Sequence, residues 1–170
     1  MSTSQLYSIL IINRSGGLIY SKLIVQHNVT TNDLLRIAST FHGINAISQY
    51  TIKINNVNNN NTHNNNNNTD TTTSTNNNNN KPYTRITPDN NGCIHIIEYD
   101  SIRIQCYESI TGIKFLLCGN ISLSHTVCDK YLYSLYVLYC DYVLKNPFYD
   151  LENPIRVEKF DILVKQLIQT

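Results

Sequence analysis

The sequence lacks any run of lysine or arginine, because its thirteen basic and twelve acidic residues are interspersed and leave a formal net charge of +1. Binding to nucleic acid or to an anionic membrane surface relies on a concentrated basic patch, so both functions are disfavoured. No stretch approaches the roughly 18 apolar residues of a membrane-spanning helix. The apolar run Leu6–Ile12 follows no basic segment, which argues against a secretory signal. We therefore expect a soluble, cytoplasmic protein without a transmembrane segment.

The short motifs that carry chemistry are also missing. The sequence contains no GxxxxGKS or GxxxxGKT phosphate loop, no GxGxxG after a strand, no HExxH and no GxSxG. Its five cysteines include no CxxC pair and no zinc-ligand spacing, so we expect reduced thiols in the core and no metal. The sequence therefore predicts no cofactor and no catalytic residue.

One pair of residues keeps a catalytic alternative open. Cys93 and His95 are two residues apart on a predicted strand, where alternate side chains face the same side. A contact between thiol and imidazole would suit a small cysteine hydrolase. A structural pair is the favoured interpretation, because no local signature activates the thiol.

Asparagine is the residue in excess. The chain has 25 asparagines among 170 residues, and 16 of them lie in residues 55–80, where Val57 is the only large apolar side chain. Such a tract buries too little apolar surface to offset the entropy of ordering its backbone. We predict a disordered loop inserted at residues 55–80 into one domain that spans residues 1–170. Deleting Val57–Asn80 should then leave folding intact. A prion-like assembly segment is the alternative.

The first half of the chain predicts a hairpin and a helix. Gln5–Asn13 and Leu18–Val25 are rich in β-branched residues and flank a Gly-Gly turn, as in a β-hairpin. The first of these strands is almost continuously apolar, which predicts a central strand covered on both faces. Capping residues and helical spacing then predict a helix over Asn32–Tyr50.

The second half predicts three strands and two helices. The strands are Cys93–Tyr99, Ile102–Tyr107 and Ile113–Cys118, and short turns join them as an antiparallel meander. A wide apolar stripe predicts a helix over Ser122–Lys145, and a last amphipathic segment follows at residues 157–168. The order ββαβββαα indicates an α+β domain with helices on an antiparallel sheet.

Tyrosine points to a surface for partners. Six of the twelve tyrosines lie between Tyr131 and Tyr149. Those on the long helix cannot all face one core, so we expect Tyr133 and Tyr136 to lie outside the apolar stripe as anchors of a protein interface. A wide boundary layer against the sheet would give the same pattern.

Four segments carry a resemblance to a known family: Ile11–Tyr20 (IINRSGGLIY), Ile37–Gln49 (IASTFHGINAISQ), Ile110–Phe115 (ITGIKF) and Tyr142–Asp161 (YVLKNPFYDLENPIRVEKFD). They resemble the sybindin-like subunits of the TRAPP vesicle-tethering complex. The resemblance implies a longin-like fold, in which a five-stranded antiparallel sheet carries one helix on one face and two on the other. Two departures stand out: the loop Gln26–Thr30 is short where some relatives carry a large insertion, and the asparagine tract is foreign to the family pattern.

The resemblance also implies a function without bond chemistry. Such subunits are non-enzymatic scaffolds of a complex that promotes nucleotide exchange on a Rab-family GTPase in transport from the endoplasmic reticulum to the Golgi. The implied partners are other TRAPP subunits, among them a smaller longin-like relative, and the GTPase. The implied location is cytoplasmic, peripheral at endoplasmic reticulum and cis-Golgi membranes through the complex. The alternative is a longin-domain coat-adaptor small chain or SNARE-type module without an exchange role.

The motif positions become candidate partner-binding residues. They fall in the ITGIKF segment and around the proline-fixed turns of the last similar segment. They are Thr111, Gly112, Lys114, Lys145, Asn146, Pro147, Phe148, Tyr149 and Pro154.

Overall fold

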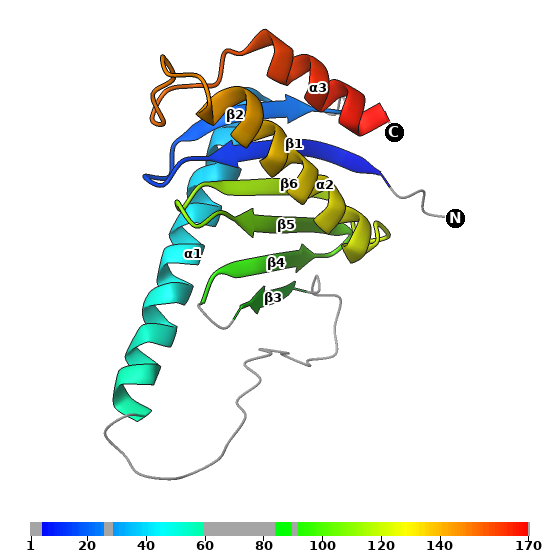
Figure 1. The fold of residues 1–170 in the computed structure, drawn as a ribbon. Coiled ribbons are helices and arrows are strands. Elements are labelled where there is room, and N and C mark those ends of the chain that lie inside the picture. The colour runs from blue at the N-terminus through cyan, green and yellow to red at the C-terminus, as the bar shows by residue number, and fades with distance from the viewer. Residues whose placement is uncertain (1–4, 26–28, 60–83, 90–91, 170) are drawn as a thin grey trace.

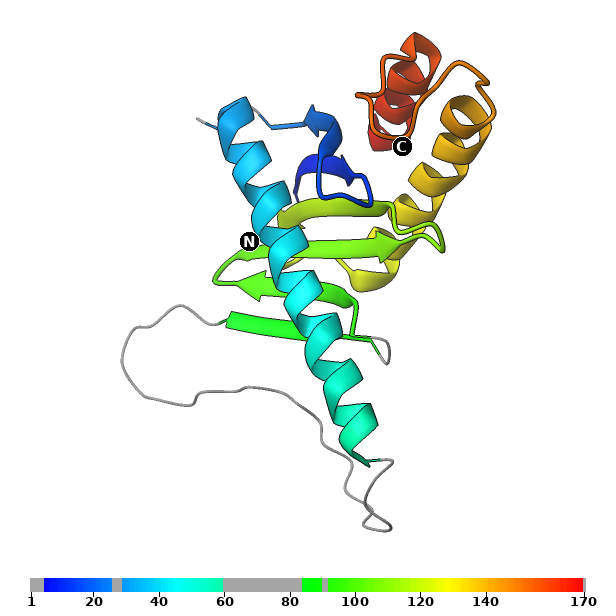
Figure 2. The same cartoon turned by 90° about the vertical axis from the view of Figure 1, so that its left-hand side faces the viewer.

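The computed structural model describes residues 5–25, 29–59, 84–89 and 92–169. They form one antiparallel sheet with α1 on one face and α2 and α3 on the other (Figures 1 and 2). This is the α+β arrangement that the sequence predicts. The elements are β1 (Leu6–Ile12), β2 (Leu18–Leu23), α1 (Thr31–Asn59), β3 (Thr84–Pro88), β4 (Ile94–Tyr99), β5 (Ile102–Glu108), β6 (Lys114–Asn120), α2 (His125–Tyr139), the π-helical turn η1 (Cys140–Leu144) and α3 (Glu158–Gln169).

The sheet has six strands, one more than the five expected. Its order is β2-β1-β6-β5-β4-β3, and β3 is the strand that the sequence analysis did not predict. β3 has one large apolar residue, Ile86, so it carries no alternating pattern. Pairing with β4 orders it, with Arg85 opposite Glu98 and Ile86 opposite Ile97. Tertiary context therefore decides this strand rather than local propensity.

Two cores lie on the two faces of the sheet. Ile9 and Ile11 of β1 pack with α2 and α3, whereas Leu10 and Ile12 pack with α1. All four side chains are at most 1% exposed. The prediction of a central strand covered on both faces is thus confirmed.

Helix α1 begins at a capping box and is longer than predicted. The Thr30 hydroxyl donates to Asp33 at 2.7 Å, and the Asp33 backbone N–H donates back to that hydroxyl at 3.3 Å. Hydrogen bonds from Thr30 lower the pKa of Asp33. The helix passes the predicted end at Tyr50 because no proline or glycine follows Gly43 before Asn59. Residues 55–59 therefore belong to α1, and the rest of the tract predicted to be disordered, up to residue 80, falls within residues 60–83, outside the described residues.

Helices α2 and α3 close the other face. α2 continues into η1, and this continuous segment ends before Pro147, as the sequence predicts. Asp161 ties α3 to β2, because its carboxylate accepts hydrogen bonds from Tyr20 at 2.9 Å and Lys22 at 3.1 Å. Lys165 pairs with the same carboxylate at 2.8 Å.

Candidate interaction surface

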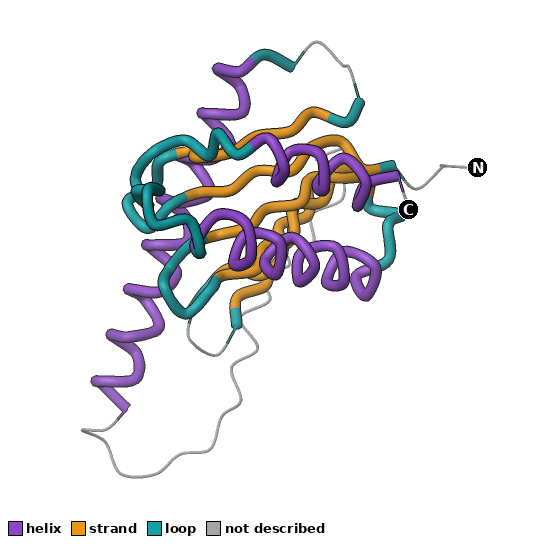
Figure 3. Tube along the Cα trace, turned by 45° about the horizontal axis from the view of Figure 1, so that its top comes forward, coloured by secondary structure: helices purple, strands orange, loops and turns teal. Residues whose placement is uncertain are grey.

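Three turns gather at one end of the sheet, and we call this region the loop end. It comprises residues 13–17 between β1 and β2, residues 109–113 between β5 and β6, and residues 145–154 after η1 (Figure 3). Glu152 accepts hydrogen bonds from Asn13 at 2.7 Å and from Ser15 at 2.6 Å. These contacts hold two of the three turns together.

The turn of residues 109–113 is rigid and presents an apolar tip. The Gly112 N–H donates to the Ser109 carbonyl at 2.9 Å, and the Thr111 and Ser109 hydroxyls lie 3.0 Å apart. Gly112 has φ of +84°, which favours glycine, and a Cβ there would lie 3.2 Å from Cγ of Arg14. Ile110 at the tip is fully exposed. The turn therefore holds an isoleucine out into solvent.

Lys114 is buried, although the sequence predicts it as a partner-binding residue. Its side chain is 5% exposed, and its ammonium lies 3.4 Å from Glu108 and donates to the Gly112 carbonyl at 3.2 Å. A charge inside a sheet costs free energy unless it is paired, and both contacts compensate it. Lys114 thus supports the turn from beneath.

The segment after η1 presents a second apolar tip. The Asn146 side chain accepts from the Phe148 N–H at 3.1 Å, and its carbonyl accepts from the Tyr149 N–H at 3.1 Å. Phe148 is 95% exposed, and Pro147 and Lys145 are exposed beside it. The Lys145 ammonium donates to Asp141 at 2.6 Å, which raises the lysine pKa. The preceding π-helical turn is of a kind often found at functional sites.

Tyr149 and Pro154 lie where the segment contacts the rest of the fold. Tyr149 packs against the core of α2 and α3, and its hydroxyl donates to the Asn153 carbonyl at 2.9 Å. Pro154 is exposed, and next to it the Ile155 N–H donates to the Ile19 carbonyl of edge strand β2 at 2.8 Å. The last similar segment is therefore anchored to the sheet on both sides of its exposed Phe148.

Comparisons with known proteins identify the family of this chain. The family model described as the Sybindin-like family matches residues 6–170. The chain belongs to the Sybindin-like family. It is 30% identical over 162 residues to the trafficking protein particle complex subunit 4 of Dictyostelium discoideum, a match that covers 95% of this chain and 94% of that protein.

Mammalian relatives match over a shorter stretch. The human trafficking protein particle complex subunit 4 is 36% identical over 87 residues, which cover 51% of this chain and 39% of the human protein. The bovine protein of the same name is 34% identical over the same length. The longin-like fold that the family implies is the fold observed here, with the additional strand β3.

The two predicted tyrosine anchors of this Sybindin-like chain have different environments. Tyr133 is 59% exposed on α2. Tyr136 is half-buried, because its ring packs against Tyr107 at 5.2 Å and Phe115 at 5.8 Å. Tyr133 therefore faces solvent, and Tyr136 belongs to the boundary layer over the sheet.

The open edge of the sheet is a second candidate surface that sequence reasoning missed. Among the described residues, β3 pairs with β4 alone, and Ile86 on it is 39% exposed. The C-terminal half of α1 extends past β3 (Figure 1) and exposes Ile47, Tyr50 and Ile54 to solvent. An open strand edge beside apolar side chains is a template for pairing with another chain. The 3- and 4-residue spacing of the exposed α1 residues is the signal that could have indicated it.

The structure also contains a buried polar cluster that the sequence patterns did not predict. Arg103 pairs with Glu98 at 2.7 Å, with both side chains less than a tenth exposed, and donates to the Leu123 carbonyl. Gln105 donates to Asp129 of α2 at 2.6 Å. The register of the predicted hairpin places Glu98 opposite Arg103, and this pairing could have indicated the cluster from the sequence. These contacts fix the start of α2 on the sheet.

The cysteine hydrolase alternative is contradicted by the structure. The Cys93 thiol accepts a hydrogen bond from Gln49 of α1 at 2.9 Å, whereas His95 lies 3.7 Å from Asp129 of α2. The two side chains thus have different polar partners, and among the described residues no hydrogen bond joins the thiol to the imidazole. Burial, together with a hydrogen bond to Glu108, raises the pKa of Cys93 to about 11, which disfavours the thiolate.

The described residues include neither a metal-binding cluster nor a membrane-spanning helix. Within the described part of the chain, no group of three or more His, Cys, Asp or Glu side chains could hold a metal ion. Among the same residues, no helix is both long and apolar enough to span a bilayer.

Proposed function

We propose that this chain is a structural subunit of a trafficking protein particle complex. The observation that carries the proposal is the match to the Dictyostelium subunit, which covers almost all of both chains. The exposed tips of the loop end support it, since a scaffold subunit needs rigid apolar anchors and no catalytic group.

Within that complex, the loop end contributes to the surface that promotes nucleotide exchange on a Rab-family GTPase. Ile110 and Phe148 are its anchors, on turns held by backbone hydrogen bonds. A partner accelerates exchange when it binds more tightly to the GTPase conformation that holds nucleotide weakly. Such differential binding requires a preorganised surface, and the hydrogen-bonded turns supply one.

A smaller longin-like subunit docks at the open edge of β3 and on the extension of α1. The exposed Ile47, Tyr50 and Ile86 supply apolar contact area there. The complex acts in transport from the endoplasmic reticulum to the Golgi, and the chain reaches those membranes peripherally through the complex. The role is that of a non-catalytic subunit.

The proposal is tested by purification through a tag on this chain from its own cells. We expect other subunits of the trafficking complex to co-purify, and the purified complex to accelerate nucleotide release from its Rab-family GTPase. Replacing both tips, Ile110→Ala with Phe148→Ala, should reduce exchange activity by about tenfold, the scale of losing two interface anchors.

The control replaces Ile162→Ala, an exposed apolar residue of α3 outside the loop end. This variant should keep full activity. A chain that purifies alone would contradict the subunit role. An unchanged exchange rate in the tip variant would contradict only the role of the loop end.

A further inference from the structure

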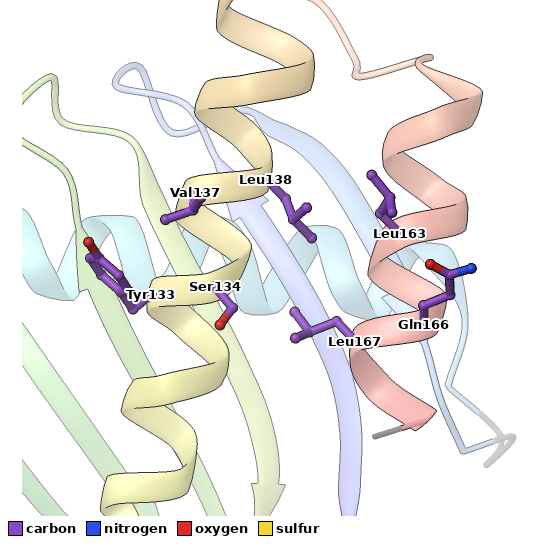
Figure 4. Close-up of a pocket in the computed structure, with 7 residues that line it drawn as sticks. All are labelled: Tyr133, Ser134, Val137, Leu138, Leu163, Gln166 and Leu167. Atoms are coloured by element: carbon purple, nitrogen blue, oxygen red, sulfur yellow. The ribbon is translucent and has the colours of Figure 1, made fainter.

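An open apolar groove runs along helices α2 and α3, away from the loop end and from the edge of β3. Its volume is about 400 Å³, and none of its lining side chains carries a formal charge. Figure 4 shows Leu138 of α2 and Leu167 of α3 directed toward one another between the helices. The groove is lined by Tyr133, Ser134, Val137, Leu138, Leu163, Gln166 and Leu167.

The α2 side of the groove presents an exposed anchor. Tyr133 is 59% and Val137 38% exposed, and they are one helical turn apart. The Tyr133 ring lies 6.4 Å from the ring of Tyr136, which itself packs on Phe115. Tyr133 thus offers an exposed ring to a partner beside the half-buried Tyr136.

Both ends of the groove carry positive charge. Lys130 lies one turn before Tyr133 on the exposed side of α2, and Lys159 lies one turn before Leu163 on α3, with its ammonium 5.0 Å from the centroid of the Tyr142 ring. Because α2 and α3 run in opposite directions (Figures 1 and 4), the two lysines lie toward opposite ends of the groove. Within the described residues neither ammonium has a carboxylate within 4.0 Å, whereas Lys165 is paired with Asp161. The groove therefore combines an apolar floor with a cation at each end.

We infer that this groove binds an amphipathic helix of a protein partner that carries acidic residues at both ends of its apolar stripe. A third helix suits the space between two packed helices, where ridges of side chains fit into grooves. The acidic ends follow from charge complementarity with Lys130 and Lys159. A second copy of this chain is a poorer occupant, because the same groove would bring lysine against lysine.

The test uses the isolated full-length chain, so its outcome does not depend on the subunit role proposed above. Two synthetic helical peptides serve as probes, with leucines at identical positions of one face and either glutamates or lysines at both ends of that face. Fluorescence anisotropy measures their affinities. We expect the glutamate peptide to bind at least about tenfold more tightly. The double variant Lys130→Glu with Lys159→Glu should reverse the preference.

Tyr133→Ala should weaken binding of the glutamate peptide by at least about tenfold. The matched control Tyr99→Ala changes a tyrosine that is 50% exposed at the end of β4, and it should leave binding unchanged. Thermal unfolding of each variant checks that the fold is intact. Absence of binding, equal affinity for both peptides, insensitivity to Tyr133→Ala, or dimerisation of the chain through Tyr133 in sedimentation would each overturn the inference.

Discussion

Phe148 and Tyr149 are neighbours in the sequence with opposite surroundings. The same pattern of motif residues predicted both as interface anchors, yet Phe148 points into solvent and Tyr149 packs on the core. The difference arises in the turn, since Asn146 binds both backbone N–H groups and thereby fixes which ring turns outward. Lys114 is a similar case, because only the fold shows that its ammonium is enclosed with Glu108. Motif positions identify the region, whereas side-chain direction depends on hydrogen bonds within each turn.

Asp161 shows how a single carboxylate holds α3 on the sheet. Hydrogen bonds from Lys165, and then from Tyr20 and Lys22, lower the pKa of Asp161 from 3.8 to about 2. A depressed folded-state pKa contributes stability that is fully present above the unfolded value and is lost as pH falls through the folded value. The window for this loss therefore runs from about pH 4 down to about pH 2.

We expect Asp161→Asn to lower the free energy of unfolding by about 1 kcal/mol at pH 7, a modest value because the side chain is 36% exposed. The difference from wild type should shrink between pH 4 and pH 2. Urea unfolding across that range measures it. The control Asp141→Asn removes another i,i+4 contact with lysine and should cost at most about 0.5 kcal/mol. A pH-independent difference would contradict the role given to the Asp161 carboxylate.

At the scale of elements, the helices and the five apolar strands could be predicted from the sequence. Their periodic patterns agree with the burial that the structure gives them, as for β1 and α2. β3 and the extension of α1 could not be predicted. β3 depends on pairing with β4, and the residues beyond Tyr50 carry no strong helical stripe. Part of the loop end could be predicted from the sequence, because its motifs are local. The edge of β3 could not, because tertiary contacts create it.

The connection between α1 and β3 yields a prediction about the asparagine tract. Since α1 runs to Asn59, a deletion that spares both elements starts at residue 60. Replacing residues 60–80 with a glycine–serine linker of about ten residues should stabilise the domain by roughly 0.5 kcal/mol, because a connection of about half the length has a smaller entropy cost of closure. Chemical unfolding measures this, and co-purification of partner subunits should persist. A loss of partner subunits from a stable variant would assign the tract a role in assembly.

At the scale of the whole molecule, the side chains that stabilise the domain and the apolar side chains that are exposed for contact lie in different places. Both cores lie within the layers, between the sheet and its helices, whereas the most exposed apolar side chains, Ile110 and Phe148, lie at the loop end. The open edge of β3 lies at the far side of the sheet from β2, whose own edge receives the Ile155 segment. Among the described residues, the edge of β2 thus contacts the Ile155 segment, whereas β3 pairs with β4 alone.

This asymmetry predicts where assembly protects the backbone. We expect the amides of residues 84–87 to exchange hydrogen more slowly in the purified complex than in the isolated chain, because a docked subunit covers the edge of β3. The amides of residues 114–120 are the internal control, and their exchange should change little, since β6 is already paired with β1 and β5 in the free chain. Exchange followed by mass spectrometry over seconds to hours resolves both segments. Unchanged exchange at β3 in a complex that contains the other subunits would mean that they assemble through another face, and it would remove the edge from the proposal while leaving the subunit role in place.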